Sequence, residues 1–358
     1  MNDDVSYIKE TLRLAKKGIG WTNPNPLVGA VIVKNGKILG KGYHHKIGNP
    51  HAEIEALRST TEDITGATIY INLEPCSHFG RTPPCAEAVI KSGLTRVVFA
   101  NTDPNPKVAG KGMRLMQKAG IEVISGVLEE EAWFLNEAFF TFHEKNRPFV
   151  AIKFAASLDG KIATKTNDSK WITNKKARRM ARKLRSHYQA ILVGSNTVIH
   201  DDPHLGTRQR GKKEPLRIIL DSTLSVPLES QVLRDTNVLI ATTERADKKK
   251  KRALQKKGIG ILEFTGNKIP LPELLQKLRE KDIISVFVEG GGSVLGSFVD
   301  TGLVDKVYAF HAPIIVGGKE AISAVQGNGS ETIQQSLHLK KIYHKLFEDT
   351  LLTIGYTN

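Results

Sequence analysis

The chain has 358 residues, a length that predicts two domains, each able to bury a core of its own. Hydrophobic residues make up 40% of it and charged residues 25%, a balance that excludes a disordered chain. The formal net charge is +15, almost all of it after Arg147, and such an excess favours anionic partners, either nucleic acid or phosphorylated small molecules.

No segment approaches the ~18 consecutive apolar residues that a membrane-spanning helix needs, and the acidic first residues lead into no signal-peptide core. We therefore expect a cytoplasmic protein. Because a reducing cytoplasm does not sustain a disulfide framework, Cys76 and Cys85 are expected to be metal ligands or reactive thiols. The basic run 248–252 suits a nucleic-acid contact or a solvated helix face, and its place between two strand-like runs favours the helix face.

The first half alternates helical and strand-like patterns. An amphipathic helix is expected over 5–17, and the Asn-Gly turn that follows it predicts a hairpin. The expected strands are 27–33, 38–43, 67–73 and 96–100, the expected helices are 52–58, 85–91 and 128–144, and a further helix and strand are expected around 112–124. This alternation predicts a sheet layered with helices. The pattern ends before Pro148, so we expect domains of 1–147 and 148–358.

From residue 149 the pattern restarts as a second α/β domain. Its expected strands are 149–155, 190–193, 216–220, 238–241, 260–264 and 284–288, its expected helices are 175–187, 246–257 and 271–279, and β-rich segments around 307–310 and 351–354 end it. Glu289-Gly-Gly-Gly-Ser293 follows a strand and precedes a helical run, which suits either a phosphate-binding loop or a tight turn. The spacing of its glycines disfavours a Rossmann domain.

One histidine and two cysteines of the first half form a candidate metal site. His51 precedes the helix 52–58, Cys76 follows a strand, and Cys85 begins the next expected helix. One imidazole and two thiolates can hold zinc and leave its fourth position to water. Glu53 is then placed to move protons between water and a leaving amine, as the non-ligand glutamate of zinc nucleobase deaminases does.

Two observations leave open an alternative to a catalytic zinc site, namely a structural one. Eight residues separate the cysteines, whereas the usual deaminase signature has two. A closed structural zinc site would need a fourth ligand, which His44, His45 or His78 could supply. The acid two residues from a ligand favours the catalytic interpretation, because a structural site has no need of it.

At these motifs the sequence resembles the bifunctional riboflavin-biosynthesis deaminase/reductases, over nearly the whole chain. The resemblance rests on the segments 23–30 (NPNPLVGA), 51–53 (HAE), 73–78 (LEPCSH), 82–85 (TPPC), 103–106 (DPNP), 153–163 (KFAASLDGKIA), 169–173 (SKWIT) and 197–203. The eight-residue cysteine spacing is itself the form found in this family. The resemblance implies an α/β chain, with an N-terminal cytidine-deaminase-like αβα domain followed by a C-terminal dihydrofolate-reductase-like α/β domain.

The family's two reactions are implied in the same way. The first is zinc-dependent hydrolytic deamination of 2,5-diamino-6-ribosylamino-4(3H)-pyrimidinone 5′-phosphate. The second is NADPH-dependent reduction of the ribosyl group of 5-amino-6-(5-phosphoribosylamino)uracil to ribityl. The expected cofactors are therefore Zn²⁺ and NADPH, and the expected partners are phosphorylated pyrimidines, with no nucleic acid and no membrane. Family members commonly form homo-oligomers, so we expect one here.

Site residues follow from the resemblance position by position. In the deaminase half it implies the metal ligands His51, Cys76 and Cys85, the proton shuttle Glu53, and the substrate residues Asn25, His44, His78, Arg81, Asp103 and Asn105. In the reductase half it implies the cofactor residues Ala155, Trp171, Thr197, Asp201, Ser222, Gly290, Gly291, Gly292 and Ser293, and the substrate residues Ser169, Arg185, Leu205, Arg208 and Glu289.

Elementary chemistry supports some of these roles and offers plainer ones for others. Asparagine amides match the donor and acceptor edges of a pyrimidine, and arginines match a phosphate, but Asn105 could also be only a turn former. Lys153 or Asp201 could be the polar group near the carbon that receives the hydride. Arg185 could instead lie on a basic helix face, Asp201 in a turn, and Thr223 could replace Ser222.

Three rival functions stay open at this point. A nucleic-acid-editing deaminase would bind nucleic acid through the basic second half. A non-catalytic scaffold would use zinc structurally. In the third, only one half of the chain is active.

Overall fold

The computed structural model describes residues 2–77, 84–106, 108–209 and 211–357. The chain divides into two compact units, Met1–Asn146 and Arg147–Asn358. The division falls one residue before the boundary expected from the sequence. Arg147 joins the second unit because its guanidinium donates to both carboxylate oxygens of Asp305, at 2.6 and 2.8 Å. Among the described helices, none combines the length and apolar character that crossing a membrane requires.

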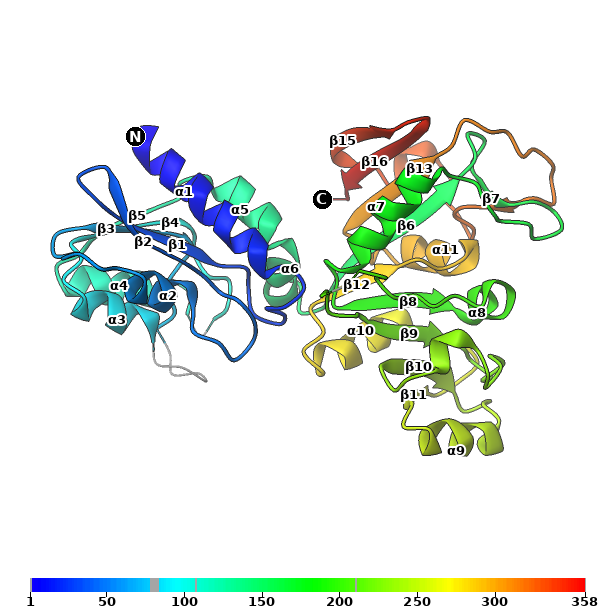
Figure 1. Cartoon of the computed structure of the whole chain (residues 1–358). Coiled ribbons are helices and arrows are strands. Elements are labelled where there is room, and N and C mark those ends of the chain that lie inside the picture. The colour runs from blue at the N-terminus through cyan, green and yellow to red at the C-terminus, as the bar shows by residue number, and fades with distance from the viewer. Residues whose placement is uncertain (1, 78–83, 107, 210, 358) are drawn as a thin grey trace. The chain divides into compact units, whose positions relative to one another are not determined.

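The first unit contains a five-stranded sheet with helices on both faces (Figure 1). Its strands are β1 (Gly29–Lys34), β2 (Lys37–Tyr43), β3 (Thr68–Leu73), β4 (Arg96–Asn101) and β5 (Glu122–Ser125). Its helices are α1 (Asn2–Ala15), η1 (Lys16–Gly18), α2 (Ala52–Arg58), α3 (Cys85–Lys91), α4 (Lys111–Lys118), α5 (Glu129–Leu135) and α6 (Glu137–Glu144). The strand order is β2-β1-β3-β4-β5, in which β1 is antiparallel to β2 and β3, while β3, β4 and β5 are parallel.

The alternation of side chains along β1 explains the layers. Ala30 and Ile32 point into a core shared with α2, α3 and α4, whereas Val31 and Val33 point into a second core shared with α1 and α5. Since every residue of β1 from 29 to 33 is buried, the sheet is apolar on both faces and needs a helix layer on each.

The single helix expected over 128–144 is two helices, so its predicted continuity is wrong. The break falls at Asn136, whose φ of −112° and ψ of 22° depart from helical values. The Asn136 side chain bonds the backbone of Leu27, which is far away in sequence. Helical periodicity continues across the break, so the sequence pattern carries no sign of this tertiary contact.

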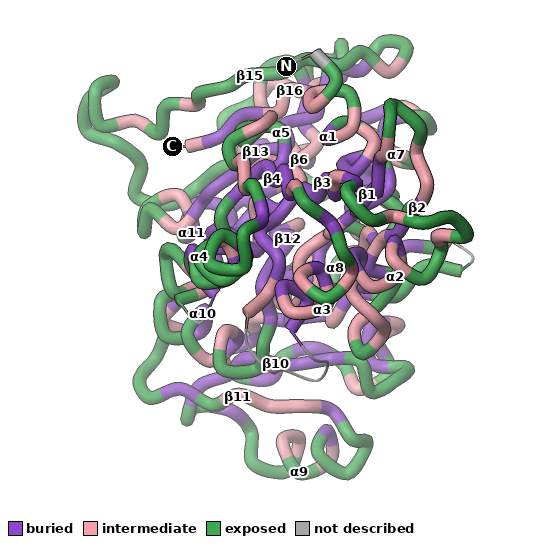
Figure 2. The backbone as a smooth tube through the Cα atoms, turned by 90° about the vertical axis from the view of Figure 1, so that its left-hand side faces the viewer, coloured by how far each residue is buried: buried purple, intermediate pink, exposed green. Residues whose placement is uncertain are grey.

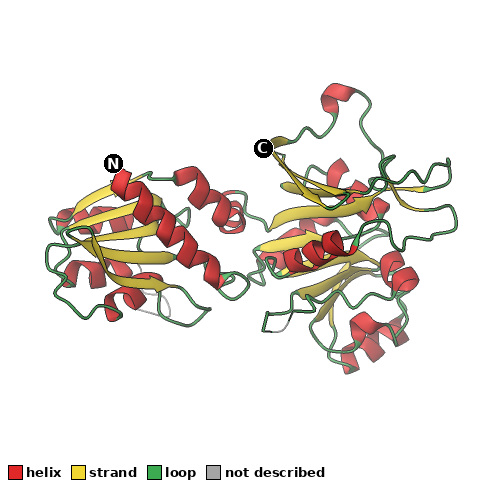
Figure 3. Ribbon diagram, turned by 45° about the horizontal axis from the view of Figure 1, so that its top comes forward, coloured by secondary structure: helices red, strands yellow, loops and turns green. Residues whose placement is uncertain are grey.

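The second unit is built on a nine-stranded sheet of order β11-β10-β9-β8-β12-β6-β13-β16-β15 (Figure 3). The strands of the unit are β6 (Phe149–Ala156), β7 (Lys161–Ala163), β8 (Ala190–Gly194), β9 (Leu216–Leu220), β10 (Val238–Thr243), β11 (Gly260–Phe264), β12 (Ser285–Val288), β13 (Lys306–His311), β14 (Ile322–Ser323), β15 (Lys340–Phe347) and β16 (Thr350–Tyr356). Of these, β7 and β14 pair with each other in a separate two-stranded sheet. Its helices are α7 (Lys175–Arg185), α8 (Ser195–Asp201), η2 (Gln231–Leu233), α9 (Lys248–Lys256), α10 (Leu271–Arg279), α11 (Gly292–Asp300) and η3 (Ile333–Gln335). In this order, the first seven strands, from β11 at the edge to β13, are parallel to one another. The last two strands, β16 and β15, are antiparallel to their neighbours.

Burial along the second unit separates core from surface elements (Figure 2). The central strands are buried and share an apolar core with α10 and α11. Helix α9, which carries the basic run, has one buried residue, Leu254. The basic run therefore lies on a helix that is mostly exposed to solvent. Helix α8 and the strands β7, β14 and β15 were not expected from the sequence. Seven of the eight residues of β15 are exposed, so this strand lacks the apolar alternation that predicts one.

Candidate active sites

The three candidate metal ligands converge because two helices begin beside the end of one strand. His51 immediately precedes α2, Cys76 follows β3, and Cys85 is the first residue of α3. His51 Nδ1 lies 3.6 Å from Cys76 Sγ and 3.3 Å from Cys85 Sγ, and all three ligand atoms lie within 4.8 Å of one another. A tetrahedral zinc ion with ordinary Zn–S and Zn–N bonds separates its ligand atoms by roughly 3.5–3.8 Å. The donor set and spacing therefore fit one zinc ion.

The described residues supply no fourth protein ligand to this cluster. Both ring nitrogens of His44 are engaged elsewhere, with Asn25 Nδ2 at 3.2 Å and the carbonyl of Pro50 at 3.1 Å. His45 stacks on Tyr43 instead, with ring centroids 3.9 Å apart. His78 lies outside the described residues. Neither His44 nor His45 therefore closes the cluster. Among the described residues the fourth ligand position is left open, as it is in a catalytic zinc site.

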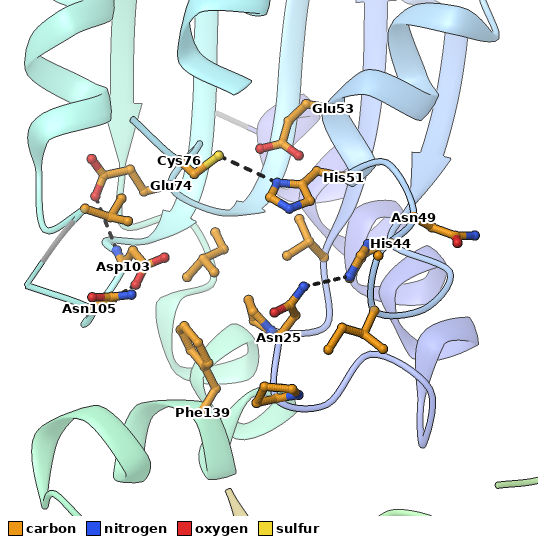
Figure 4. A pocket seen from close by; sticks show the side chains of 17 residues that line it. Asn25, His44, Asn49, His51, Glu53, Glu74, Cys76, Asp103, Asn105 and Phe139 are labelled. Atoms are coloured by element: carbon orange, nitrogen blue, oxygen red, sulfur yellow. Dashed lines mark hydrogen bonds between the residues drawn. The ribbon is translucent and has the colours of Figure 1, made fainter. Parts of the chain in front are cut away.

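Glu53 lies beside this cluster on the first turn of α2. Its side chain is buried, and burial raises the pKa of its carboxyl to about 7. Figure 4 shows the Glu53 carboxylate and the Cys76 sulfur on the same side of the His51 ring. A carboxyl group that titrates near neutrality can both accept and return a proton, which is the property a proton shuttle needs.

A cavity of about 300 Å³ opens in front of the cluster. Four of the expected substrate residues line it, namely Asn25, His44, Asp103 and Asn105. The other two, His78 and Arg81, lie outside the described residues. Asp103 Oδ1 accepts a hydrogen bond from the Asn105 backbone N–H at 2.8 Å, and burial raises the pKa of Asp103 to about 7. Asn105 therefore lies in an Asp-initiated turn and also lines the cavity.

Parallel strand ends explain why residues from two motifs meet here. Cys76 follows β3 and Asp103 follows β4, and the carboxyl ends of neighbouring parallel strands share one edge of a sheet. Glu74, which the sequence analysis missed, joins the two segments. Its carboxylate accepts backbone N–H bonds from Asp103 at 3.3 Å, Gly110 at 2.9 Å and Met113 at 3.0 Å. The signal available in the sequence was an acid between a strand and a metal-ligand motif.

The cavity also has an apolar side that the sequence did not indicate. Phe139 of α6 lines it together with Val28 and Leu73. Because Phe139 belongs to a helical pattern that predicts core packing, periodicity alone could not distinguish a cavity wall from core.

A second cavity, of about 470 Å³, lies in the second unit. It is lined by the ends of the parallel strands β6 and β12 together with residues from α7 and α8. Of the expected reductase residues, it is lined by Ala155, Trp171, Thr197, Asp201, Gly290, Gly291, Lys153, Ser169, Arg185, Leu205, Arg208 and Glu289. The structure thus brings together residues from six separate segments of the sequence.

Three expected cofactor residues do not line this cavity. The Ser222 carbonyl accepts hydrogen bonds from the backbone N–H and hydroxyl of Thr243, at 3.3 and 2.8 Å. The Ser293 hydroxyl donates to Gln326 at 2.9 Å. A Cβ at Gly292 would meet the Ser323 carbonyl oxygen at 2.4 Å, so close packing already requires glycine there.

Arg185 and Glu289, which both line the second cavity, form a largely buried ion pair. Arg185 Nε and Nη2 donate to the two oxygens of Glu289 at 2.7 and 2.8 Å, and Nη1 donates to the Gly206 carbonyl at 3.0 Å. The structure therefore places Arg185 in an internal pair, which differs from the free phosphate-binding cation suggested by the sequence. Lys153 Nζ lies 3.9 Å from Glu289, and burial lowers the pKa of Lys153.

Further cations line the same cavity from α7 and the neighbouring loops. Arg178 lies 4.2 Å from the centroid of the Trp171 ring and donates to the Thr173 carbonyl. Burial and the nearby arginines, first among them Arg208, lower the pKa of Arg182. Like charges gathered in this way favour an anionic ligand such as a phosphate. Neither Arg178 nor Arg182 was among the site residues expected from the sequence.

Comparisons with known proteins cover both units. The profile of the RibD C-terminal domain matches residues 148–352, and the profile of the cytidine and deoxycytidylate deaminase zinc-binding region matches residues 1–101. The riboflavin biosynthesis protein RibD of Aquifex aeolicus is 48% identical over 351 residues, covering 98% of this chain and 97% of that protein. The Escherichia coli protein of that name is 40% identical over 328 residues, covering 88% and 89%.

Solved structures agree over the full length. The Acinetobacter baumannii RibD structure is 36% identical and superposes with a TM-score of 0.91, covering 99% of each chain. A Thermotoga maritima protein described as a diaminohydroxyphosphoribosylaminopyrimidine deaminase/5-amino-6-(5-phosphoribosylamino)uracil reductase is 37% identical, with a TM-score of 0.87 and 99% coverage of both chains.

Proposed function

The chain belongs to the RibD family of riboflavin biosynthesis, and from this membership we propose which residues carry each of its two activities. It is a bifunctional enzyme, a zinc-dependent deaminase and an NADPH-dependent reductase. We assign the deaminase to Met1–Asn146 and the reductase to Arg147–Asn358. The observation that carries the first assignment is the cluster of His51, Cys76 and Cys85 beside Glu53, at the end of a cavity large enough for a pyrimidine.

The proposed substrates are the two pyrimidine phosphates expected from the sequence. In the first reaction, water adds at the ring carbon that bears the 2-amino group, and the C–N bond breaks to release ammonia. In the second, a hydride and a proton convert the ribosyl group of the product into ribityl. Two observations support this pair of reactions. The description of the Thermotoga maritima relative names both a deaminase and a reductase, and each unit of this chain contains a cavity.

In the deaminase, His51, Cys76 and Cys85 would hold zinc. When bound, zinc supplies a Lewis-acidic charge that lowers the pKa of water toward ~7. Glu53 takes the proton from the attacking water and delivers it to the departing amino nitrogen. Asn25, His44, Asp103 and Asn105 would hold the polar edges of the ring, as their positions around the cavity allow. We keep His78 and Arg81 as proposed substrate residues on the resemblance alone.

In the reductase, Ala155, Trp171, Thr197, Asp201, Gly290 and Gly291 would hold NADPH. Gly292, Ser293 and Ser222 are proposed on the resemblance alone. When bound, NADPH supplies the hydride, which goes to C1′ of the sugar. Lys153 is our candidate for the proton donor to the sugar oxygen, because its lowered pKa makes the ammonium a better acid.

For the phosphate of the reductase substrate we propose Arg208 and Ser169, since Arg185 is already paired with Glu289. Leu205 lines the same cavity and is proposed to contact the substrate through its backbone or side chain. In this arrangement Arg185 and Glu289 act on the substrate through Lys153, which lies 3.9 Å from Glu289.

One assay tests these proposals. The purified chain is incubated with the diaminopyrimidine phosphate, with and without NADPH, and the products are identified by mass spectrometry. We expect the deaminated ribosyl product without NADPH and the ribityl product with it. A missing first product would refute the deaminase assignment, and its accumulation in the presence of NADPH would refute the reductase assignment. The homo-oligomer stays a prediction, which light scattering on the same sample would test.

A further inference from the structure

We propose that the turn between α5 and α6, together with the first turn of α6, is part of the deaminase substrate site. In this proposal Asn136 is a positioning residue that holds the loop carrying Asn25, and Phe139 is the apolar wall against which the pyrimidine ring lies. The inference rests on the proposed deaminase function and extends it to a helix outside the matched zinc-binding region, which ends at residue 101.

The Asn136 side chain forms hydrogen bonds with both the backbone N–H and the backbone carbonyl of Leu27. Its Oδ1 accepts from the Leu27 N–H at 2.8 Å, and its Nδ2 donates to the Leu27 carbonyl at 3.0 Å. Asn72 donates to the same carbonyl at 2.8 Å. Leu27 precedes β1, which begins at Gly29, so these side chains take the place of strand pairing at this residue. Asn136 is only 4% exposed; its loss would remove this partner from the Leu27 N–H, whereas the Leu27 carbonyl would keep the bond from Asn72.

Holding Leu27 fixes the part of the loop that reaches the cavity. Asn25 lies two residues before Leu27, lines the cavity, and places its Nδ2 3.2 Å from His44 Nε2. The position of Asn25 against His44 therefore depends on an anchor supplied by a residue more than a hundred positions later. A shift of this loop would move the amide that we assign to a polar edge of the substrate.

Phe139 follows Asn136 by about one helical turn, so the anchor and the wall come from the same short segment. Its ring packs with Leu73 and Phe140 and lines the cavity. Figure 4 shows Phe139 across the cavity from His51, in the interval between Asn25 and Asn105. Among the described lining residues it is the one phenyl ring.

The chemistry of a pyrimidine matches this division of the cavity. A pyrimidine ring has polar edges and two apolar faces, and proteins that bind single bases hold the edges with hydrogen bonds and the faces with aromatic or aliphatic side chains. Asn25, His44, Asp103 and Asn105 offer hydrogen bonds, and Phe139 offers an apolar face. The wall binds ground state and transition state alike, so its loss should raise KM and leave kcat nearly unchanged.

The test uses steady-state deamination by the full-length chain, with the reductase reaction of the same sample as an internal control. We expect Phe139→Leu to raise the KM of deamination roughly fivefold to twentyfold, because leucine keeps apolar bulk but loses the aromatic face. The matched control is Phe140→Leu, since Phe140 packs in the same cluster and does not line the cavity. Its KM should stay within about twofold of the wild-type value.

The anchor is tested by Asn136→Asp, which keeps the acceptor but turns a carboxylate oxygen toward the Leu27 carbonyl. We expect a raised KM at unchanged zinc content and unchanged reductase rate. Asn136→Ser, which is smaller and loses both bonds, gives the same comparison if the aspartate variant does not fold.

The outcomes separate this inference from the function it rests on. A wild-type chain without deaminase activity refutes the proposed function, and the inference falls with it. With an active wild type, an unchanged KM in Phe139→Leu, or an equal rise in Phe140→Leu, overturns the wall. Lost zinc and a lowered kcat at constant KM in both Asn136 variants overturn the anchor, because that pattern reports a smaller folded fraction.

Discussion

Replacing Glu289 by glutamine should destabilise the reductase unit strongly. The change is nearly isosteric, but it removes the charge that faces Arg185 and Lys153 and turns an amide N–H₂ toward the Arg185 donors. The side chains of Arg185 and Glu289 are 15% and 7% exposed, so water compensates for only a small part of the loss. Removing one partner of a buried ion pair costs about 3–5 kcal/mol.

That free energy converts into a measurable change in melting temperature. For a domain of this size, each kcal/mol shifts the melting temperature by about 2–4 °C, so Glu289→Gln should lower it by roughly 6–20 °C. Differential scanning calorimetry measures the shift, and the transition of the reductase unit is the one that NADPH raises. The reductase rate should fall as well, because without the Glu289 charge the pKa of Lys153, already lowered by burial, falls further and a smaller fraction of Lys153 carries the proton that it would donate.

The chain offers a matched control at the surface. Glu348 pairs with Lys176 at 2.8 Å, and their side chains are 53% and 67% exposed. An exposed pair contributes about 0–1 kcal/mol, so Glu348→Gln should barely change the melting temperature. The reasoning would be refuted if Glu289→Gln melted within ~2 °C of the wild type, or no lower than Glu348→Gln.

The remaining predictions concern the deaminase unit. Glu53→Gln should lower deamination about 10²–10⁴-fold while the metal content, measured by atomic absorption, stays the same. Chelation of zinc should abolish deamination and spare the reductase rate, whereas parallel loss of both activities would count against separate sites. Because burial raises the pKa of Asp103 to about 7, protonated Asp103 stabilises the fold at low pH and this contribution is lost as the pH rises through about 7. Asp103→Asn should therefore raise the melting temperature of zinc-free protein more at pH 8 than at pH 5, and an equal change at both would contradict the shift. Glu74→Gln should cost about 1–3 kcal/mol in urea unfolding, since one oxygen that accepts backbone N–H bonds becomes a donor; a variant as stable as the wild type would show that these bonds are dispensable.

Local patterns were enough to predict most elements and the metal cluster. Helices α2 and α3 have the bounds expected from the sequence, because apolar periodicity and the start of each helix are encoded within a few residues. His51, Glu53, Cys76 and Cys85 could be identified because few chemistries need those residue types in that order. The resemblance placed the remaining site residues without any geometry.

Only the tertiary structure decided which segments distant in sequence contact one another. The break at Asn136 depends on the backbone of Leu27, and the pairing of Arg185, at the end of α7, depends on Glu289, which follows β12. Phe139 both belongs to a buried apolar cluster and lines the cavity, and only the tertiary structure shows the second of these. Periodicity records which face of an element avoids water but not what that face meets, so anchors, ion pairs and cavity walls appear only once the elements have packed.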